Sequence, residues 1–300
     1  MQIGIDLGAT KIESVLLDQK GTEVLRERHN TPKDYKETII SIRNIVKNIE
    51  EKFNKKFSVG ICHPGSIISE TGLIKNSNNA LWMNNKPFQK DISSELNRII
   101  YCENDANCFA LSEATDGSAS HYKIVFGVIL GSGCGGGLVI DKKIISGSNG
   151  LSGEWGHNPL PYYGNLSDEN INLGESAFVK NINIEKFISG KAIEDLYFEK
   201  KKERKSTKEI FSDENNNKEF ISNFHNRLSR SLSILLNIID PDVIVFGGGV
   251  SNEIKDLNLI KQMTANFSGN SNIKTSFIKP KYGDASGVRG AAILGRGNSI

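Results

Sequence analysis

The chain has 300 residues, of which 38% are hydrophobic, and this is enough to bury a sizeable core in two domains or lobes. Its formal net charge of +2, from 37 basic and 35 acidic residues, gives no field that favours nucleic acid or a membrane surface as a partner. No secretory signal pattern opens the chain, and no apolar run approaches the roughly 18 residues of a membrane span. The four cysteines match neither a CxxC ligand pair nor a disulfide framework, so we expect a reducing, cytoplasmic location without membrane spanning.

The first part of the chain is predicted to open with a hairpin. Residues 3–17 indicate two strands joined through Gly8, because apolar residues bracket a short turn of Gly and Thr. Apolar residues between 39 and 53 then recur at the three-to-four-residue spacing of one buried helix face. A short strand is predicted at 59–62, where it ends at a Pro-Gly pair.

The second half restarts in the same way. Residues 125–130 predict a strand, 131–137 a glycine-rich turn and 138–140 a returning strand. This weak repeat of the first hairpin predicts two lobes of similar topology, each able to point its glycine turn into a shared cleft. Small and polar residues cluster at 115–120, where we place the boundary.

A long amphipathic helix is predicted from the apolar stripe between residues 221 and 239. Asp240 and Pro241 end this helix before a strand predicted at 243–246, which runs into three glycines. Strands therefore alternate with helices, and the predicted class is α/β.

Three glycine-rich turns each follow an apolar strand. Glycine permits positive φ and close backbone approach, so consecutive N–H groups can converge on phosphate oxygens. One such turn more often only closes a hairpin, but three in one chain favour nucleotide binding, although none is a Walker A loop or a complete GxGxxG motif. The turns are Gly8-Ala9-Thr10-Lys11, Gly131-Ser132-Gly133-Cys134-Gly135-Gly136-Gly137 and Gly247-Gly248-Gly249.

Two aspartates are candidates for the chemistry. Asp6 ends the first predicted strand, where its carboxylate could hold the hydration shell of Mg²⁺ beside bound phosphates or could only stabilise the turn. Asp105 lies at a predicted strand-to-helix junction beside Asn104. Its carboxylate could accept the proton of an attacking hydroxyl in phosphoryl transfer, or it could be a helix N-cap.

Glu154 and His157 lie close together in a segment rich in glycine. Such a pair suits the vicinal hydroxyls of a sugar, which both give and take hydrogen bonds. A structural histidine and half of a metal site are the competing interpretations of His157. Glu185 by itself resembles a surface residue at the start of a helix.

Together these features make the chain resemble the ROK family of sugar kinases in the actin/hexokinase/Hsp70 superfamily, most closely its bacterial fructokinase or manno(fructo)kinase branch. The similarity covers nearly the whole chain, and the ordered set of motifs is far more specific than any glycine turn. The motifs are IGIDLGATKIE, HPGSI, NSNNALWMNNKPF, ENDANCFALSEATDG, GSGCGGG, GEWGHNPLP, DPDVIVFGGGVSN and GDASGVRGAA.

The resemblance implies an α/β fold of two RNase H-like lobes around a central cleft. The expected lobes are residues 1–116, completed by 285–300, and residues 117–284. ATP and Mg²⁺ are the implied cofactors, with ATP held by all three glycine turns and the sugar between the lobes. A homodimer is the implied assembly.

Site residues are carried over only at matching positions. Asp105 matches the catalytic base, and Asp6 is expected to hold Mg²⁺ through water. The implied sugar-binding residues are Gly65, Asn78, Asn104, Asp105, Glu154, His157 and Glu185. The implied ATP-binding residues are Asp6, Gly8, Ala9, Thr10, Lys11, Gly131, Ser132, Gly133, Cys134, Gly135, Gly136, Gly247 and Gly248.

The chain departs from the family pattern at three places. Ala9 stands where the family usually has glycine. The family's CxCGxxGC zinc cluster aligns with residues 176–183, which contain no cysteine, so we expect no zinc site. One extra residue falls within 79–81, at the rim of the implied sugar pocket, and it leaves the identity of the sugar open.

The leading prediction is therefore an ATP-dependent hexose kinase acting on fructose or mannose. The alternative within the same class is a kinase of N-acetylglucosamine or N-acetylmannosamine. ROK transcriptional repressors carry an N-terminal helix-turn-helix domain, which disfavours a repressor because the first predicted strand here begins at Ile3. A catalytically inactive sugar sensor is disfavoured by the presence of Asp105.

Overall fold

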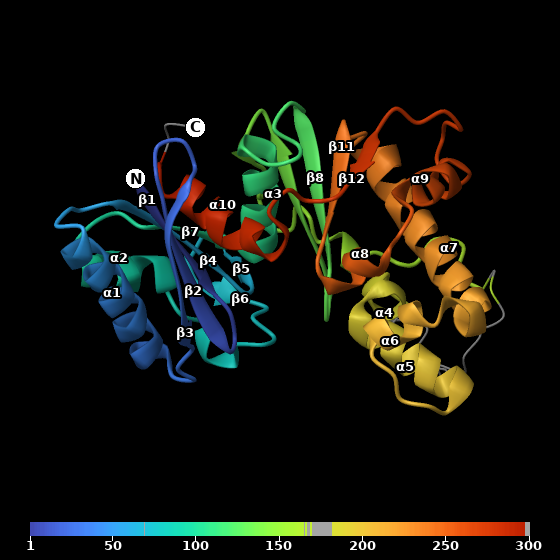
Figure 1. Cartoon of the computed structure of the whole chain (residues 1–300), viewed down its shortest axis with the longest axis horizontal. Coiled ribbons are helices and arrows are strands. Elements are labelled where there is room, and N and C mark those ends of the chain that lie inside the picture. Colours follow the sequence, from blue (N-terminus) through green and yellow to red (C-terminus); the bar gives the residue numbers. More distant parts are fainter. Residues whose placement is uncertain (69, 165, 167–168, 170–181, 298–300) are drawn as a thin grey trace. The chain divides into compact units, whose positions relative to one another are not determined.

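The computed structural model describes residues 1–300 except 69, 165, 167–168, 170–181 and 298–300 (Figure 1). The chain divides into two compact units, which we call unit 1 and unit 2. Unit 1 comprises Met1–Lys123, Gly137–Gly153 and Lys281–Ile300, and unit 2 comprises Ile124–Gly136 and Glu154–Pro280.

Unit 1 contains a five-stranded sheet with the strand order β3-β2-β1-β4-β7 (Figure 1). β1 pairs antiparallel with β2, and β2 with β3, which confirms the predicted opening hairpin. β4 and β7 add in parallel on the other side of β1, and parallel neighbours need crossover connections. The strands are β1 (Gln2–Leu7), β2 (Lys11–Leu17), β3 (Glu23–Asn30), β4 (Ser58–His63) and β7 (Tyr101–Asn104).

Helices cover both faces of this sheet because strand side chains alternate between the faces. α1 buries the predicted apolar stripe, with Ile42 and Val46 fully buried, in one core cluster with α2 and with Ile3 and Ile5 of β1. α10 lies so close to the opposite face that a Cβ on Gly4 would meet the Val288 carbonyl oxygen at 2.1 Å. The helices are α1 (Tyr35–Lys52), α2 (Phe88–Leu96), α3 (Asp105–Thr115) and α10 (Ser286–Leu294).

Short elements complete this part of the chain. β5 and β6 form a two-stranded ribbon between β4 and α2, and a single turn of 3-10 helix follows it. A second 3-10 turn precedes α10. Their bounds are β5 (Ser66–Ile67), β6 (Ile74–Lys75), η1 (Leu81–Met83) and η5 (Gly283–Ala285).

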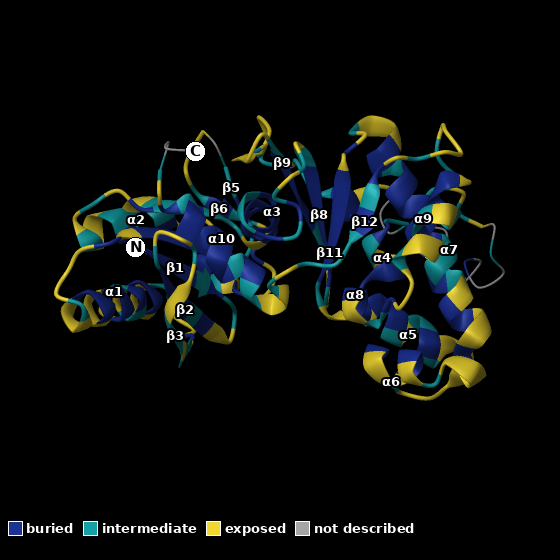
Figure 2. Ribbon diagram, turned by 45° about the horizontal axis from the view of Figure 1, so that its top comes forward, coloured by how far each residue is buried: buried dark blue, intermediate teal, exposed yellow. Residues whose placement is uncertain are grey.

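The second sheet has five strands in the order β10-β9-β8-β11-β12. β11 pairs in parallel with β8 and with β12, and Figure 2 shows β8 and β11 as buried strands. β9 passes from unit 2 into unit 1 after Gly136. The strands are β8 (Ile124–Leu130), β9 (Cys134–Ile140), β10 (Lys143–Ile144), β11 (Val243–Gly247) and β12 (Ser276–Ile278).

The long helix of unit 2 is α7 (Glu214–Ile238), which buries Phe224, Leu228 and Leu232 along the predicted stripe. It ends before Pro241, as the sequence predicts, and β11 follows. No helix in the described part of the chain is both long and apolar enough to cross a bilayer. The other helices are η2 (Trp155–His157), α4 (Glu185–Ile188), α5 (Gly190–Lys201), α6 (Thr207–Ser212), α8 (Gly249–Glu253) and α9 (Leu257–Ala265).

Candidate functional site

The first glycine turn joins β1 to β2 and is held by backbone and side-chain hydrogen bonds. The Gly8 amide donates to the Lys11 carbonyl at 2.9 Å, and a Cβ on Gly8 would meet that oxygen at the same distance. The Thr31 hydroxyl donates to the Gly8 carbonyl at 2.8 Å. Thr10 and Lys11 remain exposed, and Ala9 is accommodated between them and Gly8. The turn is therefore fixed while its outer residues stay accessible to a ligand.

Asp6 stands immediately before this turn in an unfavourable environment for a charge. Burial, first, and the negative charge of Asp105, second, raise the pKa of Asp6 from 3.8 to about 6, although a hydrogen bond from Cys62 opposes the shift. Gly287 of α10 leaves room here, since a Cβ on it would lie 3.4 Å from Oδ2 of Asp6. The carboxylates of Asp6 and Asp105 therefore lie close enough in unit 1 to repel each other.

Asn104 and Asp105 take different roles at the start of α3. Asn104 is the N-cap: its side-chain oxygen accepts from the amides of Ala106 at 2.9 Å and Asn107 at 3.4 Å. Its amide nitrogen donates to the Gly65 carbonyl at 3.1 Å. Asp105 is the first residue of the helix, it is exposed, and its Oδ1 accepts from the Ala106 amide at 2.8 Å. Asn104 therefore fills the N-cap position, and Asp105 is an exposed residue of the first helical turn.

Glu103 stabilises this junction through three hydrogen bonds, and it was not among the residues predicted from the sequence. Its carboxylate accepts from the Asn104 amide at 2.7 Å, the Asn107 side chain at 3.1 Å and the Ser146 hydroxyl at 3.0 Å. Ser146 belongs to the loop after β10, so Glu103 ties that loop to the residues beside Asp105. The signal that could have revealed it is its place directly before two polar residues at a strand end.

The two remaining predicted sugar-binding residues of unit 1 lie in loops. Gly65 has φ of +83°, and a Cβ there would meet the Lys75 carbonyl at 2.5 Å, so only glycine fits. Asn78 is exposed in a loop that the Asn84 side chain closes by accepting from the Ser77 amide at 2.9 Å. Asn84 is a second positioning residue that the sequence did not indicate.

In unit 2 the second and third glycine turns are adjacent, because they follow two paired strands. β8 and β11 run in parallel, with Gly247 in register with Ile129. Gly248 has φ of +86°, and a Cβ on it would meet the Leu130 carbonyl at 2.4 Å. By contrast, a Cβ on Gly131 would meet nothing within 4 Å. The contact therefore requires glycine at 248, whereas at Gly131 the direction that a side chain would take is open to a ligand.

Glu154, His157 and Glu185 surround the beginning of β9. Glu185 opens α4, and its Oε2 accepts from the Cys134 amide at 2.9 Å. Burial and the carboxylates of Glu185 and Glu154 raise the pKa of the Cys134 thiol well above its usual range, which favours the neutral thiol over the thiolate. The His157 ring lies 3.5 Å from the Glu154 carboxylate, and its side chain is 65% exposed.

A cavity of about 380 Å³ adjoins the second glycine turn of unit 2. It is large enough for part of a nucleotide, and its wall combines apolar, cationic and carboxylate side chains. Ser132 lies on the glycine turn, and Gly190 at the start of α5 donates to the Gly131 carbonyl at 2.7 Å. Other lining residues are Glu169, Glu185, Lys186, Phe187, Ser189, Lys191, Ala192, Asp195, Leu196 and Glu199. Of the residues that α4 and α5 contribute, only Glu185 was predicted from the sequence, as a sugar-binding residue.

The two carboxylates of unit 1 fit Mg²⁺ that is bound through water and phosphate. A divalent cation beside Asp6 would offset the repulsion from Asp105 that contributes to its raised pKa. Among the described residues, no group of three or more His, Cys, Asp and Glu side chains could hold a metal ion. Mg²⁺ usually keeps several waters and uses one or two carboxylates with substrate phosphates, so such a group is not needed.

Part of the stretch aligned with the zinc cluster, residues 176–181, lies outside the described residues. Nearby, the fully buried carboxylate of Glu169 binds two arginines of α7, Arg227 at 3.2 Å and Arg230. Arg230 also donates to the carbonyls of Pro161 at 2.8 Å and Tyr162 at 2.7 Å. Buried ion pairs and charged hydrogen bonds thus hold Glu169 and the backbone of residues 161–162 against α7.

We expect the purified protein to contain far less than one zinc ion per chain and to stay folded in a zinc-selective chelator with excess Mg²⁺. The reason is that structural zinc sites are built largely from thiolates, and the aligned residues include no cysteine. Elemental analysis and thermal melting with and without chelator check this. Stoichiometric zinc together with chelator-induced unfolding would contradict it.

Comparisons with known proteins agree over nearly the whole chain. The sequence model of the ROK family matches residues 2–298. An N-acetyl-D-glucosamine kinase of Mannheimia succiniciproducens is 37% identical over 302 residues, which cover 98% of this chain and 99% of that protein. A ROK hexokinase from Thermus thermophilus has a TM-score of 0.81 at 22% identity, covering 97% of this chain and 96% of the other.

A second solved structure is a ROK family glucokinase from Streptomyces griseus in complex with glucose and AMPPNP. Its TM-score is 0.76 at 22% identity, with 98% of this chain and 99% of the other covered. At this identity the two structures bear on the fold alone. They confirm the expected α/β fold of the actin/hexokinase/Hsp70 type.

Proposed function

Because the chain belongs to the ROK family, we propose that it is an ATP-dependent sugar kinase and that its substrate is N-acetyl-D-glucosamine. The observation that carries the kinase proposal is the division of roles at α3, where Asn104 caps the helix and leaves Asp105 exposed. A positioned carboxylate is the one acid–base group that phosphoryl transfer to a hydroxyl demands of the protein.

The choice of sugar rests on the relatives. The sequence motifs favour fructose or mannose, with N-acetylglucosamine or N-acetylmannosamine as the alternative. The N-acetyl-D-glucosamine kinase of Mannheimia succiniciproducens matches the chain end to end at 37% identity, which favours the alternative. We therefore place N-acetyl-D-glucosamine first and fructose behind it.

In the proposed reaction Asp105 accepts the proton of the attacking sugar hydroxyl. Its hydrogen bond from the Ala106 amide fixes the direction of the carboxylate. When bound, Mg²⁺ would neutralise charge on the transferring phosphate, and Asp6 would hold its water ligands. Asn104 would bind a sugar hydroxyl through the side-chain N–H that does not donate to the Gly65 carbonyl. Each of these residues belongs to unit 1.

Unit 2 supplies the groups that we assign to the nucleotide and to further sugar contacts. The cavity beside Ser132, with Lys191 and Asp195 on its wall, offers donors and acceptors for a nucleotide. Glu154 and His157 offer a carboxylate and an exposed imidazole for sugar hydroxyls. The Gly131 and Cys134 amides of the second glycine turn already donate within unit 2, and we assign the other N–H groups of the turn to phosphate oxygens.

A substrate panel tests the proposal. We expect ATP-dependent ADP release with N-acetyl-D-glucosamine, at a kcat/KM about tenfold or more above that with fructose, mannose or glucose, because a pocket built for a polar substituent leaves its own groups unpaired when that substituent is missing. N-acetyl-D-mannosamine belongs in the panel as the epimer. Equal or better turnover of fructose would favour fructose as the substrate. No ADP release with any sugar would contradict the proposed kinase activity.

A further inference from the structure

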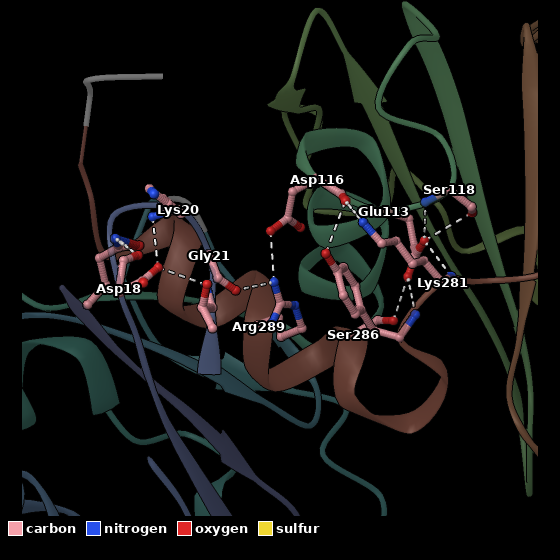
Figure 3. A network of polar contacts seen from close by, with 12 residues as sticks. Asp18, Lys20, Gly21, Glu113, Asp116, Ser118, Lys281, Ser286 and Arg289 are labelled. Atoms are coloured by element: carbon pink, nitrogen blue, oxygen red, sulfur yellow. Dashed lines mark hydrogen bonds and ion pairs between the residues drawn. The ribbon is translucent and has the colours of Figure 1, made fainter. Parts of the chain in front are cut away.

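A fully buried carboxylate near the C-terminal end of α3 binds donors from three segments of unit 1 (Figure 3). Glu113 Oε2 accepts from the Ser118 amide at 2.8 Å, its hydroxyl at 3.0 Å, and the Lys281 amide at 3.0 Å. Oε1 accepts from the Ser286 hydroxyl at 2.7 Å and the Tyr282 amide at 3.4 Å. Five donors therefore meet the roughly four lone-pair sites of one carboxylate.

The donors flank places where the chain passes from one unit to the other. Ser118 precedes the first passage, between Lys123 and Ile124. Lys281 is the first residue after the last passage, between Pro280 and Lys281. Glu113 thus binds the outgoing and the returning segment at the same carboxylate.

Close packing and a second set of bonds reinforce this anchor. A Cβ on Gly117 would meet the Glu113 carboxylate at 2.3 Å, so the outgoing segment needs glycine there. Asp116 binds Arg289 at 2.8 Å, and Arg289 also donates to the Gly21 carbonyl at 2.8 Å (Figure 3). The Arg289 guanidinium lies 3.7 Å from the ring centroid of Tyr282.

Asp105 and Glu113 belong to the same helix, eight residues or about 12 Å apart. α3 is itself held rigidly, because a Cβ on Gly290 of α10 would meet the Cys108 carbonyl at 1.8 Å. A short helix packed this tightly transmits a displacement of one end to the other. The position of Asp105 therefore depends on the anchor at Glu113.

We propose that Glu113 is a positioning residue of the kinase reaction: it fixes α3, and through it Asp105, relative to the first and the last of the segments that connect the units. Nothing in the reaction requires Glu113 to touch substrate. Its effect is on kcat, because a base displaced by about 1 Å loses roughly 10²-fold in rate. The kinetic test of this inference rests on the proposed kinase function. Hydrogen exchange provides a second test that does not depend on activity.

The test compares Glu113→Gln with Glu50→Gln. Glutamine keeps the shape but replaces one acceptor oxygen by a donor. In either orientation its NH₂ group faces at least one backbone amide, that of Tyr282 at the Oε1 position or those of Ser118 and Lys281 at the Oε2 position. Glu50 is the matched control, since it is a buried glutamate of unit 1 that binds Arg98, Lys56 and the Phe57 amide without contacting a connecting segment. Both substitutions should lower the melting temperature.

We expect Glu113→Gln alone to lower kcat by about 10- to 100-fold with little change in KM, measured well below its melting temperature. Amide exchange should become about tenfold faster in peptides covering 118 and 281–282, and Glu50→Gln should leave those peptides unchanged. Wild-type kcat in folded Glu113→Gln, or an equal loss of kcat in Glu50→Gln, would overturn the proposal.

If Glu113→Gln does not fold, Ser286→Ala and Ser118→Ala replace it, each removing one hydroxyl donor. Faster exchange of the connecting peptides with a severalfold loss of kcat supports the proposal, and wild-type values for both variants overturn it. A wild-type enzyme inactive on every sugar would instead refute the proposed function, and the exchange data would still decide the anchoring role.

Discussion

Asp105→Asn is expected to lower kcat by roughly 10²–10⁴-fold, the usual contribution of a positioned general base. Asparagine cannot accept the hydroxyl proton, yet it has the same shape and can still accept from the Ala106 amide. Since Asn104 is the N-cap, the substitution leaves the cap of α3 in place. The fold and ATP binding should therefore persist, as checked by thermal melting and by titration with an ATP analogue.

Asp34→Asn is the matched control for this variant. Asp34 is also an aspartate at a helix start in unit 1, where it caps α1 by accepting from the Glu37 amide at 3.0 Å. Asparagine caps equally well, so kcat should not change. Near-wild-type turnover in Asp105→Asn would show that Asp105 is not the base.

Periodic patterns made most of the fold predictable from the sequence. The opening hairpin, α1 and α7 follow from alternation and from three-to-four-residue spacing, because each element has one face in a core. Pro241 predicted the end of α7 through its missing N–H. These are local rules, and they hold wherever tertiary packing does not override them.

Contacts distant in sequence could not be predicted in this way. Glu113 lies in an apolar helix, and its partners Lys281 and Ser286 are 168 and 173 residues away. Glu185 resembled a surface residue, yet it binds the Cys134 amide 51 residues earlier. Neither pairing leaves a periodic or compositional signal, so only the folded chain reveals it.

The roles of adjacent polar residues were undecided for a different reason. Asn104 and Asp105 can both cap a helix, and capping preference does not separate them. The backbone separates them: Asn104 has the extended conformation of an N-cap, with φ −63° and ψ 148°, and the helix begins at Asp105. The choice of sugar depends on loops such as that of Asn78, where exposed polar residues follow no pattern that specifies a ligand.

Asp6→Asn is expected to stabilise the free protein above pH 6 while removing most of its kinase activity. The pKa of Asp6 is about 6 in the folded chain against an ordinary value of 3.8. The folded state therefore binds the proton more tightly, and the free energy of unfolding of the wild type falls as the pH rises from about 4 to about 6. Above pH 6 the charged Asp6 carboxylate lowers the free energy of unfolding by on the order of 3 kcal/mol.

Asparagine does not titrate, so the variant should gain stability over the wild type above pH 6 and lose that gain near pH 4. Activity falls because the amide cannot hold the water ligands of Mg²⁺ as a carboxylate does. Denaturant unfolding at several pH values, without nucleotide, measures the first effect, and the ADP-release assay measures the second.

Asp18→Asn, in the turn between β2 and β3, should behave in the opposite way. Hydrogen bonds from the amides of Thr22 and Lys20 lower the pKa of Asp18, so its carboxylate stabilises the fold at neutral pH and loses that effect as the pH falls. Asp18→Asn should thus be less stable than the wild type at pH 7, with unchanged kcat. If Asp6→Asn were also less stable than the wild type at pH 7, the Asp6 carboxylate would stabilise the fold. The proposal that Asp6 destabilises the free protein and serves to bind Mg²⁺ would then be wrong.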